Sequence, residues 1–310
     1  MQTTSHILMI RPVRFAFNAE TAVNNAFQVP GAEQEDVQAK AAREFESFVA
    51  MLRENGVDVT VVEDSPEPYT PDSIFPNNWV SFHTDGTLVL YPMFAPNRRL
   101  ERKAGVLDAV GERFDIRKRL DLTGWEAKSR FLEGTGSMVL DRENRIAYAC
   151  LSPRTDPNVL EAFCVKLQYQ PIEFNAFDAG QSPIYHTNVM MCIADHYVVI
   201  CLDAIPNTTE KELILLTIEQ TGKTVVPITL QQMNHFAGNM LQVENAQGEK
   251  LLVMSTQAFD SLSKDQAELL AGFNRILHTD LSVIETNGGG SARCMMAEVR
   301  LPLKKAPKGA

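Results

Sequence analysis

Five polar residues precede short apolar segments at nearly constant intervals along the chain. They are Asn78, Glu133, His186, Asn239 and Cys294, and the intervals between them are 55, 53, 53 and 55 residues. A recurring period, with a hairpin and a helix per unit, is typical of repeat architectures. In a closed ring of such units the corresponding ends meet at the axis, so the five residues would share one pocket. The spacing therefore predicts an α/β fold, a five-bladed propeller of ββαβ-like units that forms one domain over residues 1–310.

The composition excludes several classes of partner. Hydrophobic residues make up 45% of the 310 residues, and the formal net charge is −10. A chain of this charge is not expected to bind nucleic acid or an anionic membrane. No apolar run reaches the about 18 residues of a membrane span, and the first residues lack the features of a signal peptide. We therefore expect a cytoplasmic protein that acts on a small molecule. The sequence leaves homo-oligomerisation open.

The cysteines are scattered and do not form a metal-binding or disulfide pattern. They are Cys150, Cys164, Cys192, Cys201 and Cys294. Zinc sites require closely spaced cysteine and histidine ligands, and such spacing is missing here. The sequence also lacks a phosphate-binding loop and a dinucleotide fingerprint. We expect neither a metal nor a cofactor.

The last of the five positions, Cys294, follows a run of three glycines. Gly288, Gly289 and Gly290 precede Ser-Ala-Arg-Cys294, and an apolar segment follows. Glycines allow positive φ and a close approach of the backbone to a ligand. We expect a turn here, with Cys294 at the start of a strand, where its thiolate would serve as a nucleophile. The alternative is an ordinary buried cysteine beside a flexible loop.

Periodicity predicts most of the secondary structure. The expected helices are 33–54, 97–111, 157–167, 208–220 and 263–276. The expected strands are 7–10, 57–62, 79–82, 88–91, 116–122, 137–140, 145–150, 187–193, 197–202, 224–229, 239–243 and 250–254. A frayed tail is expected after Leu301.

Five motifs in order resemble those of the guanidino-group-modifying (pentein) superfamily, which includes dimethylarginine dimethylaminohydrolase, arginine deiminase and the amidinotransferases. Gly-Gly-Gly-Ser-Ala-Arg-Cys294-Met resembles the glycine-rich turn before the deiminases' nucleophilic cysteine. His186 in Tyr-His-Thr-Asn matches the family's catalytic histidine. Glu133 in Leu-Glu-Gly-Thr-Gly resembles the glutamate that orients this histidine. The resemblance, which runs from about residue 7 to 301, implies a catalytic set of Cys294, His186 and Glu133.

Two further motifs carry arginines. Cys150-Leu-Ser-Pro-Arg154-Thr-Asp looks like the hydrolases' Gly-Leu-Ser-x-Arg-Thr-Asn, and Ala-Pro-Asn-Arg98-Arg resembles Ala-Pro-Ser-Arg-Arg. In the family these arginines hold the carboxylate of the substrate. The resemblance thus implies the same role for Arg98 and Arg154.

The chain departs from the family pattern where a cationic guanidinium would be neutralised. Relatives that bind guanidinium carry Phe-Val-Glu-Asp or Phe-Thr-Arg-Asp, whereas this chain has Phe75-Pro-Asn77-Asn78. The family's Glu-Gly-Gly-Asp also loses its final acid here, to Gly136. An asparagine amide both donates and accepts hydrogen bonds, so it suits a neutral ureido group. A buried guanidinium without a counter-ion would cost several kcal/mol.

These departures favour citrulline over arginine as the substrate. The segment Phe15-Ala-Phe-Asn…Asn-Asn-Ala-Phe-Gln28 also resembles citrulline-utilisation hydrolases. We therefore expect a cysteine hydrolase that converts citrulline to ornithine, carbon dioxide and ammonia. The expected substrate-binding residues are Asp72, Asn77, Asn78, Arg98, Arg154 and Asn239.

Several alternatives remain open from the sequence. His235, in Met-Asn-His-Phe-Ala-Gly-Asn239, is the rival to His186 as the acid and base. An arginine deiminase or a dimethylarginine hydrolase is the second choice of activity, and an amidinotransferase is the third. A catalytically inactive pentein that only binds its ligand is the non-enzymatic alternative, although such a protein would not need Cys294, His186 and Glu133 together.

Overall fold

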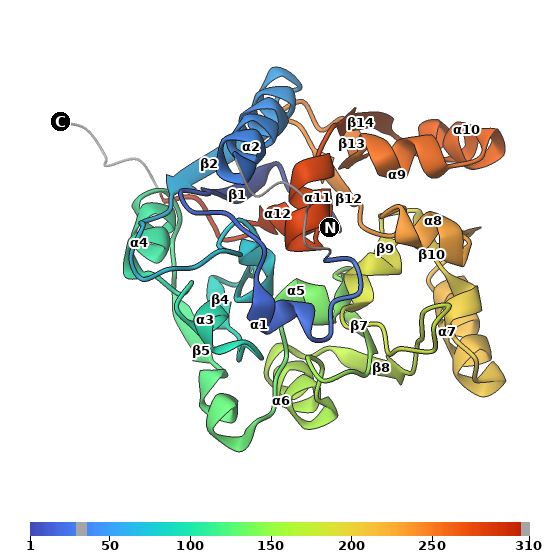
Figure 1. Ribbon diagram of the computed structural model, residues 1–310. Coiled ribbons are helices and arrows are strands. Elements are labelled where there is room, and N and C mark those ends of the chain that lie inside the picture. The colour runs from blue at the N-terminus through green and yellow to red at the C-terminus, as the bar shows by residue number, and fades with distance from the viewer. Residues whose placement is uncertain (29–35, 305–310) are drawn as a thin grey trace.

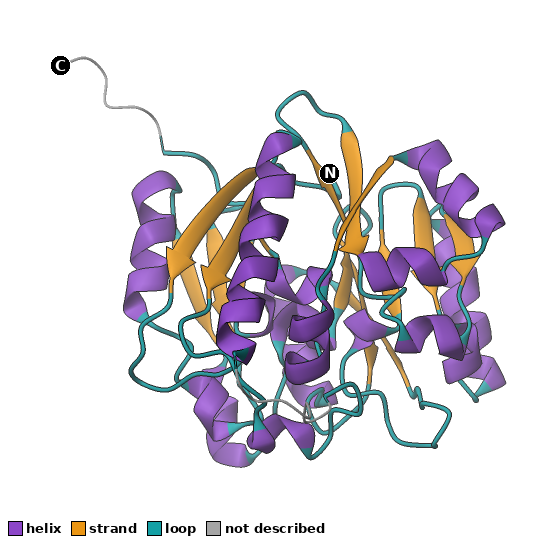
Figure 2. Cartoon of the chain, turned by 45° about the horizontal axis from the view of Figure 1, so that its top comes forward, coloured by secondary structure: helices purple, strands orange, loops and turns teal. Residues whose placement is uncertain are grey.

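The computed structural model describes residues 1–28 and 36–304, which contain five sheets of three strands each. The strand orders are β15–β1–β2, β3–β4–β5, β6–β7–β8, β11–β10–β9 and β12–β13–β14. The strands are β1 His6–Arg11, β2 Asp58–Glu63, β3 Val80–Phe82, β4 Thr87–Leu90, β5 Lys118–Asp121, β6 Val139–Asp141, β7 Ile146–Cys150, β8 Gln170–Phe174, β9 Met191–Ile193, β10 Tyr197–Ile200, β11 Thr224–Pro227, β12 Leu241–Glu244, β13 Lys250–Ser255, β14 Arg275–Thr279 and β15 Ala297–Glu298. Figure 2 shows these short strands as separate groups with helices beside them.

All five sheets have the same topology. The central strand of each sheet is antiparallel to one neighbour and parallel to the other. The antiparallel neighbours β3, β6, β9 and β12 directly precede their central strands, and the parallel neighbours follow a helix. Parallel strands need such a crossover, which is usually helical. The predicted ββαβ repeat is therefore present.

One sheet joins the two ends of the described chain. Strand β15 pairs antiparallel with β1, with Ile7 opposite Glu298 and Leu8 opposite Ala297. Strand β2 lies on the other side of β1. Because β15 follows Cys294 directly, this pairing fixes the cysteine segment against the start of the chain.

The helices vary in length from one turn to five. They are α1 Ala19–Ala22, α2 Val37–Glu54, α3 Pro96–Arg99, α4 Ala104–Arg113, α5 Gly134–Ser137, α6 Pro157–Leu167, α7 Thr208–Gln220, α8 Leu230–Asn234, α9 Thr256–Ser261, α10 Lys264–Phe273, α11 Ser282–Gly288 and α12 Ala292–Met295. Short 3-10 helices are η1 Pro76–Asn78, η2 Thr123–Lys128, η3 Thr187–Val189 and η4 Leu202–Ala204. In Figure 1, α2, α4, α6, α7 and α10 lie around the outside, and α5, α11 and α12 lie near the middle.

The crossover helices form for reasons visible in the sequence. Helix α2 buries Ala41, Phe45, Phe48 and Leu52, which recur at helical spacing and pack into one apolar cluster with β1 and β2. Helix α6 begins after Asp156, whose carboxylate accepts hydrogen bonds from two backbone N–H groups of the first turn.

Short helical turns precede the first strand of four sheets. Helix η1 leads into β3, α5 into β6, η3 into β9 and α12 into β15. Helix α5 contacts both η1 and η3, and α12 contacts η1. The turns therefore gather residues that are distant in sequence near the middle of the molecule.

Several expected boundaries were wrong. Cys294 does not start a strand; it lies in the one-turn helix α12, and β15 begins three residues later. Gly288 ends α11 rather than forming part of a flexible turn, and in that run only Gly289 has a left-handed φ, of 64°. The helix expected over 97–111 consists of α3 and α4, and β8 and β14 were not anticipated. The start of the first predicted helix (33–35) and the tail from 305 lie outside the described residues.

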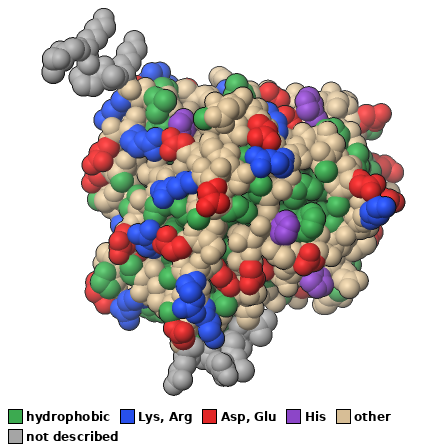
Figure 3. Space-filling model, turned by 90° about the horizontal axis from the view of Figure 1, so that it is seen from above, with side chains coloured by type: hydrophobic (Ala, Val, Ile, Leu, Met, Phe, Trp, Pro, Cys, Tyr) green, Lys and Arg blue, Asp and Glu red, His purple; other side chains and the backbone are tan. Residues whose placement is uncertain are grey.

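The surface carries charges of both signs. On the face shown in Figure 3, acidic and basic side chains are interspersed among polar and hydrophobic ones. No described helix is long and apolar enough to span a membrane.

Candidate active site

The sulfur of Cys294 lies between two side-chain amides. Nδ2 of Asn239 is 3.3 Å from Sγ, and Nδ2 of Asn188 is 3.4 Å from it. The Asn239 amide is held in this orientation because its oxygen accepts from the N–H of Arg293 and its nitrogen also donates to the Asn188 carbonyl. Donors directed at sulfur favour the negatively charged thiolate over the thiol. Cys294 therefore has the surroundings of a nucleophile.

His186 and Glu133 form a buried pair at the ends of η3 and α5. Nε2 of His186 is 2.7 Å from Oε2 of Glu133, and Oε1 of the glutamate accepts from the N–H of Phe94 at 2.9 Å. Burial alone would raise the pKa of Glu133, but Arg154 and His186 outweigh burial and hold that pKa well below its usual range. Glu133 is therefore ionised and accepts a hydrogen bond from the Nε2–H group of His186.

The imidazole of His186 is neutral in this structure. Burial lowers its pKa to about 4, although Glu133 opposes the shift. With Nε2 donating to Glu133, the other ring nitrogen, Nδ1, is free to accept a proton. Nδ1 faces Gly136, since a Cβ atom on that glycine would lie 2.8 Å from it.

Two glycines allow the asparagine segment to approach this pair. Gly134 has a φ of 48°, and a Cβ there would lie 2.3 Å from the backbone oxygen of Asn77. A Cβ on Gly136 would lie 2.3 Å from Nδ2 of Asn78. Any side chain at position 136 would thus displace Asn78 or His186.

The site contains polar atoms that the protein itself does not satisfy. Among the described residues, the buried side-chain polar atoms without a hydrogen-bond partner belong to Asp72, Asn77, Asn78, Trp79 and Asn188. Buried polar groups are normally paired, so this concentration requires an explanation. Asn188 contacts Cys294, and Asn78 packs against Gly136 beside His186. The atoms left open on these two residues are an acceptor on Asn188 and a donor on Asn78.

Arg98 lies at the site, but the protein occupies most of its donors. Its Nε and Nη2 atoms bind the Glu101 carboxylate at 2.8 and 3.0 Å, and Nη1 donates to Oδ1 of Asn78 at 2.9 Å. Burial lowers the pKa of Arg98, but Glu101 and Asp72 outweigh burial and raise it above its usual value. Arg98 is therefore a buried cation that holds Asn78.

Arg154 is also engaged within the chain. Its Nε atom donates to Oδ1 of Asn24 at 2.8 Å, and Nη2 donates to the Thr21 carbonyl at 2.7 Å. Its Nη1 atom is 3.5 Å from Oε2 of Glu133. The paired N–H donors of this guanidinium, which now bind an amide oxygen, could instead donate to a carboxylate oxygen in the same place.

Asp72 is buried close to Arg98. Its Oδ2 accepts from Asn18 at 2.7 Å and from Thr21 at 3.2 Å, and lies 3.8 Å from Nε of Arg98. Burial raises the pKa of Asp72, with Arg98 and Asn18 opposing. Its Oδ1 is one of the atoms without a partner.

The structure thus connects the predicted residues in three groups. One joins Cys294 to Asn239, the second joins His186, Glu133 and Arg154, and the third joins Arg98 to Asn78 and Asp72. The rival His235 is partly exposed, and its Nδ1 contacts the Gln231 carbonyl.

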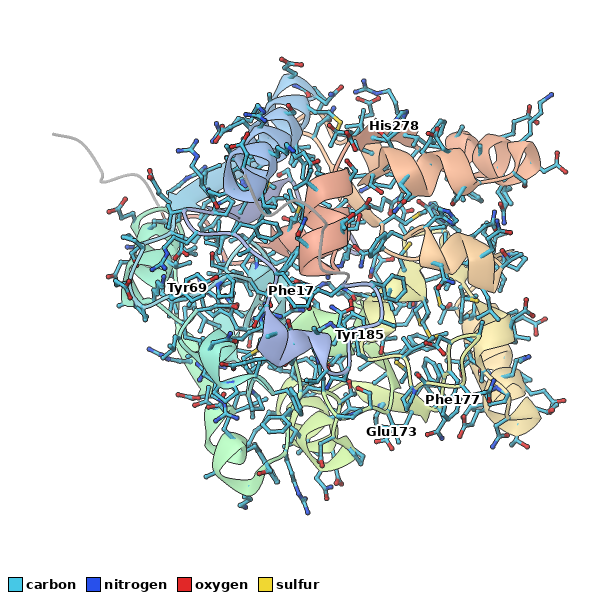
Figure 4. The ribbon with its side chains drawn as sticks, viewed as in Figure 1. Phe17, Tyr69, Glu173, Phe177, Tyr185 and His278 are labelled. Carbon is cyan, nitrogen blue, oxygen red and sulfur yellow. The ribbon has the colours of Figure 1, made fainter. Side chains whose placement is uncertain are left out.

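Sequence reasoning missed four residues. Tyr185, which lies close to the middle of the view in Figure 4, donates to the Gly289 carbonyl at 2.6 Å and has Arg154 over its ring. Asn188 lies two residues after His186, which was the available signal. Glu101 lies three residues after Arg98, a helical spacing that could have suggested the pair. Asn24 belongs to the asparagine-rich segment already noted.

The comparison with protein families now decides the relationship. The model described as "N,N dimethylarginine dimethylhydrolase, eukaryotic" matches residues 11–301. The chain belongs to this family. This membership places the chain in the pentein superfamily. A search of curated proteins found no match.

Solved structures of similar proteins agree with this membership in their fold. ArgZ, an arginine dihydrolase from the ornithine–ammonia cycle in cyanobacteria, superposes with a TM-score of 0.75 at 19% identity, covering 96% of this chain. This chain spans only 41% of full-length ArgZ. The N-terminal domain of ArgZ, in a substrate-bound cysteine-to-serine variant, has a TM-score of 0.74 at 19% identity. That superposition covers 96% of this chain and 98% of the ArgZ domain.

The family's own enzyme is also similar in structure. A histidine-to-glycine variant of dimethylarginine dimethylaminohydrolase, as its adduct with S-methyl-L-thiocitrulline, has a TM-score of 0.65 at 14% identity. The superposition covers 95% of this chain and 99% of that one. These likenesses establish the α/β fold.

Proposed function

We propose that the protein hydrolyses the ureido group of citrulline to give ornithine, carbon dioxide and ammonia. The observation that carries the proposal is the pair of unsatisfied amide groups on Asn78 and Asn188, of which Asn188 contacts the Cys294 sulfur and Asn78 lies beside the His186–Glu133 pair. Such groups match a neutral ureido function, which both accepts hydrogen bonds through its oxygen and donates them through its nitrogens.

In the proposed reaction, Nδ1 of the neutral His186 first takes the thiol proton of Cys294. The Cys294 thiolate then attacks the ureido carbon and a carbon–sulfur bond forms. The bond from that carbon to the δ-nitrogen breaks, and His186 supplies the proton with which ornithine leaves. Nδ1 of His186 then removes a proton from water, which attacks the S-carbamoyl cysteine. Carbamate leaves, the thiolate is restored, and carbamate decomposes to carbon dioxide and ammonia.

Glu133 orients His186 and stabilises it when it is charged. Because Glu133 is ionised and shared with Arg154, it can compensate the imidazolium that forms during turnover. The Nδ2 atoms of Asn78 and Asn239 are the proposed donors to the charge that develops on the ureido oxygen.

The substrate carboxylate is proposed to bind Arg154 in place of the Asn24 amide oxygen. That exchange replaces a neutral acceptor with a charged one, which strengthens the hydrogen bonds. For Arg98 we propose a positioning role through Asn78, because Glu101 already binds its fork.

A guanidino substrate is the second candidate, and Asp72 is the observation that favours it. Its unpartnered oxygen could compensate a guanidinium if it were ionised. Against this, burial raises the pKa of Asp72, which favours the neutral acid. The family match also keeps dimethylarginine among the substrates to be tested.

The deciding experiment is incubation of the purified protein with citrulline, arginine and dimethylarginine, with ornithine, citrulline and ammonia each quantified. The proposal expects ornithine and ammonia from citrulline in equal amounts. Turnover of arginine or dimethylarginine but not of citrulline would contradict it. A Cys294→Ala variant should lose at least about 1,000-fold in kcat in the same assay, because the covalent route is removed.

We also propose that the five sheets close into one five-bladed propeller that forms a single domain. The pairing of β1 with β15 supports closure, since it completes one sheet from both chain ends. The five cysteines are free and buried, which supports a reducing, cytoplasmic setting.

A further inference from the structure

Strands β3, β6 and β15 each follow a segment of the candidate active site and lead to a second polar cluster. Strand β3 lies between Asn78 and His83, β6 between Glu133 and Arg142, and β15 between Cys294 and Arg300. At about 3.3 Å per strand residue, the three residues of β3 alone span roughly 10 Å. His83, Arg142 and Arg300 therefore lie at the opposite strand ends from the catalytic residues, although Arg293, next to Cys294, reaches this cluster through Glu298.

This cluster contains more buried cations than anions. Glu298 is shared by Arg142 at 3.2 Å, Arg293 at 3.2 Å and Arg300 at 3.4 Å. All three arginines are more than nine-tenths buried. Burial and the neighbouring Arg142 lower the pKa of Arg300 to about 10 despite Glu298. One carboxylate does not balance three guanidinium groups, and unbalanced buried charge is costly.

A cavity of about 500 Å³ opens beside these residues. Its lining includes Lys118, Arg142, Arg145, Lys166 and Arg300, but only two carboxylates, Asp85 and Glu143. Asp85 is 3.9 Å from Lys118, and Glu143 is 3.2 Å from the α-amino group of Met1. In the described part of the chain, neither Arg145 nor Lys166 forms a salt bridge. The cavity is thus basic in a protein whose net charge is −10.

Several donors at the cavity are unused by the protein. Among the described residues, Nε and Nη1 of Arg142 have no hydrogen-bond partner, although this arginine is only 9% exposed and lines the cavity. Nδ1 of His83 is also without one.

His83 is placed to act as a donor. Its Nε2 lies 2.9 Å from Oγ of Ser81, which lies 2.6 Å from the Tyr91 hydroxyl. Burial and Arg142 lower the pKa of His83 to about 3, so the ring is neutral. When Tyr91 donates to Ser81 and Ser81 to Nε2, the ring proton lies on Nδ1.

We propose that this cavity is a second binding site, for a small ligand that carries a phosphate or several carboxylate groups. Guanidinium groups bind such oxyanions through paired N–H donors, and Arg142 still has Nε and Nη1 to offer. A bound anion would supply the negative charge that Glu298 alone does not provide. The proposal does not depend on which substrate the catalytic residues take.

The test is isothermal titration of the intact protein with pyrophosphate and, separately, with citrate at constant ionic strength. One-site binding with a Kd below about 1 mM is expected for at least one probe. Tighter binding of pyrophosphate assigns phosphoryl ligands, and tighter binding of citrate assigns polycarboxylates. The imidazole NMR signals of His83 should shift with the same midpoint, a response that anion binding at Arg154 in the catalytic site would not give.

Variants locate the site. Arg142→Gln should raise Kd at least about tenfold, and Lys166→Ala, which changes an exposed side chain at the rim and leaves the buried ion pairs intact, should raise it by severalfold. Lys264→Ala on helix α10 is the matched control and should leave Kd unchanged. The proposal would be overturned by any one of three results: no saturable binding up to about 10 mM of either probe, binding that Lys166→Ala does not weaken, or His83 signals that do not shift.

Discussion

Nη1 of Arg98 donates a 2.9 Å hydrogen bond to Oδ1 of Asn78 and thereby turns the amide nitrogen of Asn78 toward Gly136 and His186. The same arginine is bound by Glu101 through both oxygens. A cation that elsewhere in the superfamily is associated with the substrate carboxylate here sets the orientation of a neutral side chain. In the proposed function, the open donor of Asn78 is the group that would favour a ureido oxygen over a guanidinium.

Asn78→Asp should change the substrate preference. A carboxylate would keep the bond from Arg98 but replace the free N–H donor by an acceptor with negative charge. We expect the ratio of kcat/KM for arginine to that for citrulline to rise at least about tenfold. The measurement is steady-state kinetics with both substrates. An unchanged ratio would show that Asn78 does not discriminate between them.

Gly136→Ala should damage catalysis while the fold survives. The added Cβ would meet Nδ2 of Asn78 at 2.3 Å, so the asparagine or His186 must move. Misplacement by about 1 Å can cost about 100-fold, and we expect a loss of that order in kcat/KM. Gly124→Ala is the matched control, because a Cβ there has no atom within 4 Å. Equal activity of the two variants would remove the steric argument.

The spacing of five polar residues predicted the repeat, and it brings His186 to Glu133 and Asn239 to Cys294, because corresponding positions of equivalent units share one end of the fold. Strand β8 escaped prediction because only Ile172 and Phe174 are buried in it and Pro171 interrupts the pattern. Strand β14 follows α10 after the single extended residue Asn274, and Gly272 lies inside the last turn of the helix rather than after it, so it does not mark the boundary.

Side-chain partners were harder to predict than the backbone. Arg98 pairs with Glu101 and Asn78, and Arg154 pairs with Asn24. These pairings depend on which protein acceptors lie near each guanidinium once burial has removed its water. A sequence motif identifies such an arginine but not the protein group that accepts its hydrogen bonds. The same limit applies to Asn188, whose amide reaches Cys294 across 106 residues.

Asn188→Ala should slow the reaction of Cys294. It removes one of the two amide donors at the sulfur, and a hydrogen bond to a charged group contributes about 1.5–3 kcal/mol. We expect kcat, and the rate of alkylation by iodoacetamide at neutral pH, to fall roughly tenfold to a hundredfold. Asn158→Ala, at the exposed start of α6, is the control. Alkylation at the normal rate in Asn188→Ala would mean that this amide does not activate the thiol.

The buried His186 should make the protein less stable in mild acid. Its pKa is about 4 in the folded state, below its ordinary value of 6.5, so the unfolded chain binds a proton more readily between these pH values. Stability contributed by the neutral ring is complete above about pH 6.5 and is lost as the pH falls toward 4. Between pH 7.5 and pH 5, this one group should lower the free energy of unfolding by about 2 kcal/mol.

Urea unfolding at pH 7.5 and pH 5 measures this loss. The buried His83, with a pKa of about 3, adds a loss of the same sign, whereas burial raises the pKa values of Glu101 and Glu285 to about 7, which adds a gain of opposite sign. Only the difference between the native protein and a histidine variant isolates the contribution of His186. His186→Asn should therefore lose less stability between the two pH values than the native protein does, although it is less stable at both because Glu133 loses a partner. His196→Asn changes an exposed histidine and should retain the full loss. If His186→Asn also retained it, His186 would have to be protonated in the folded protein at pH 5, and its assignment as a neutral imidazole would be wrong.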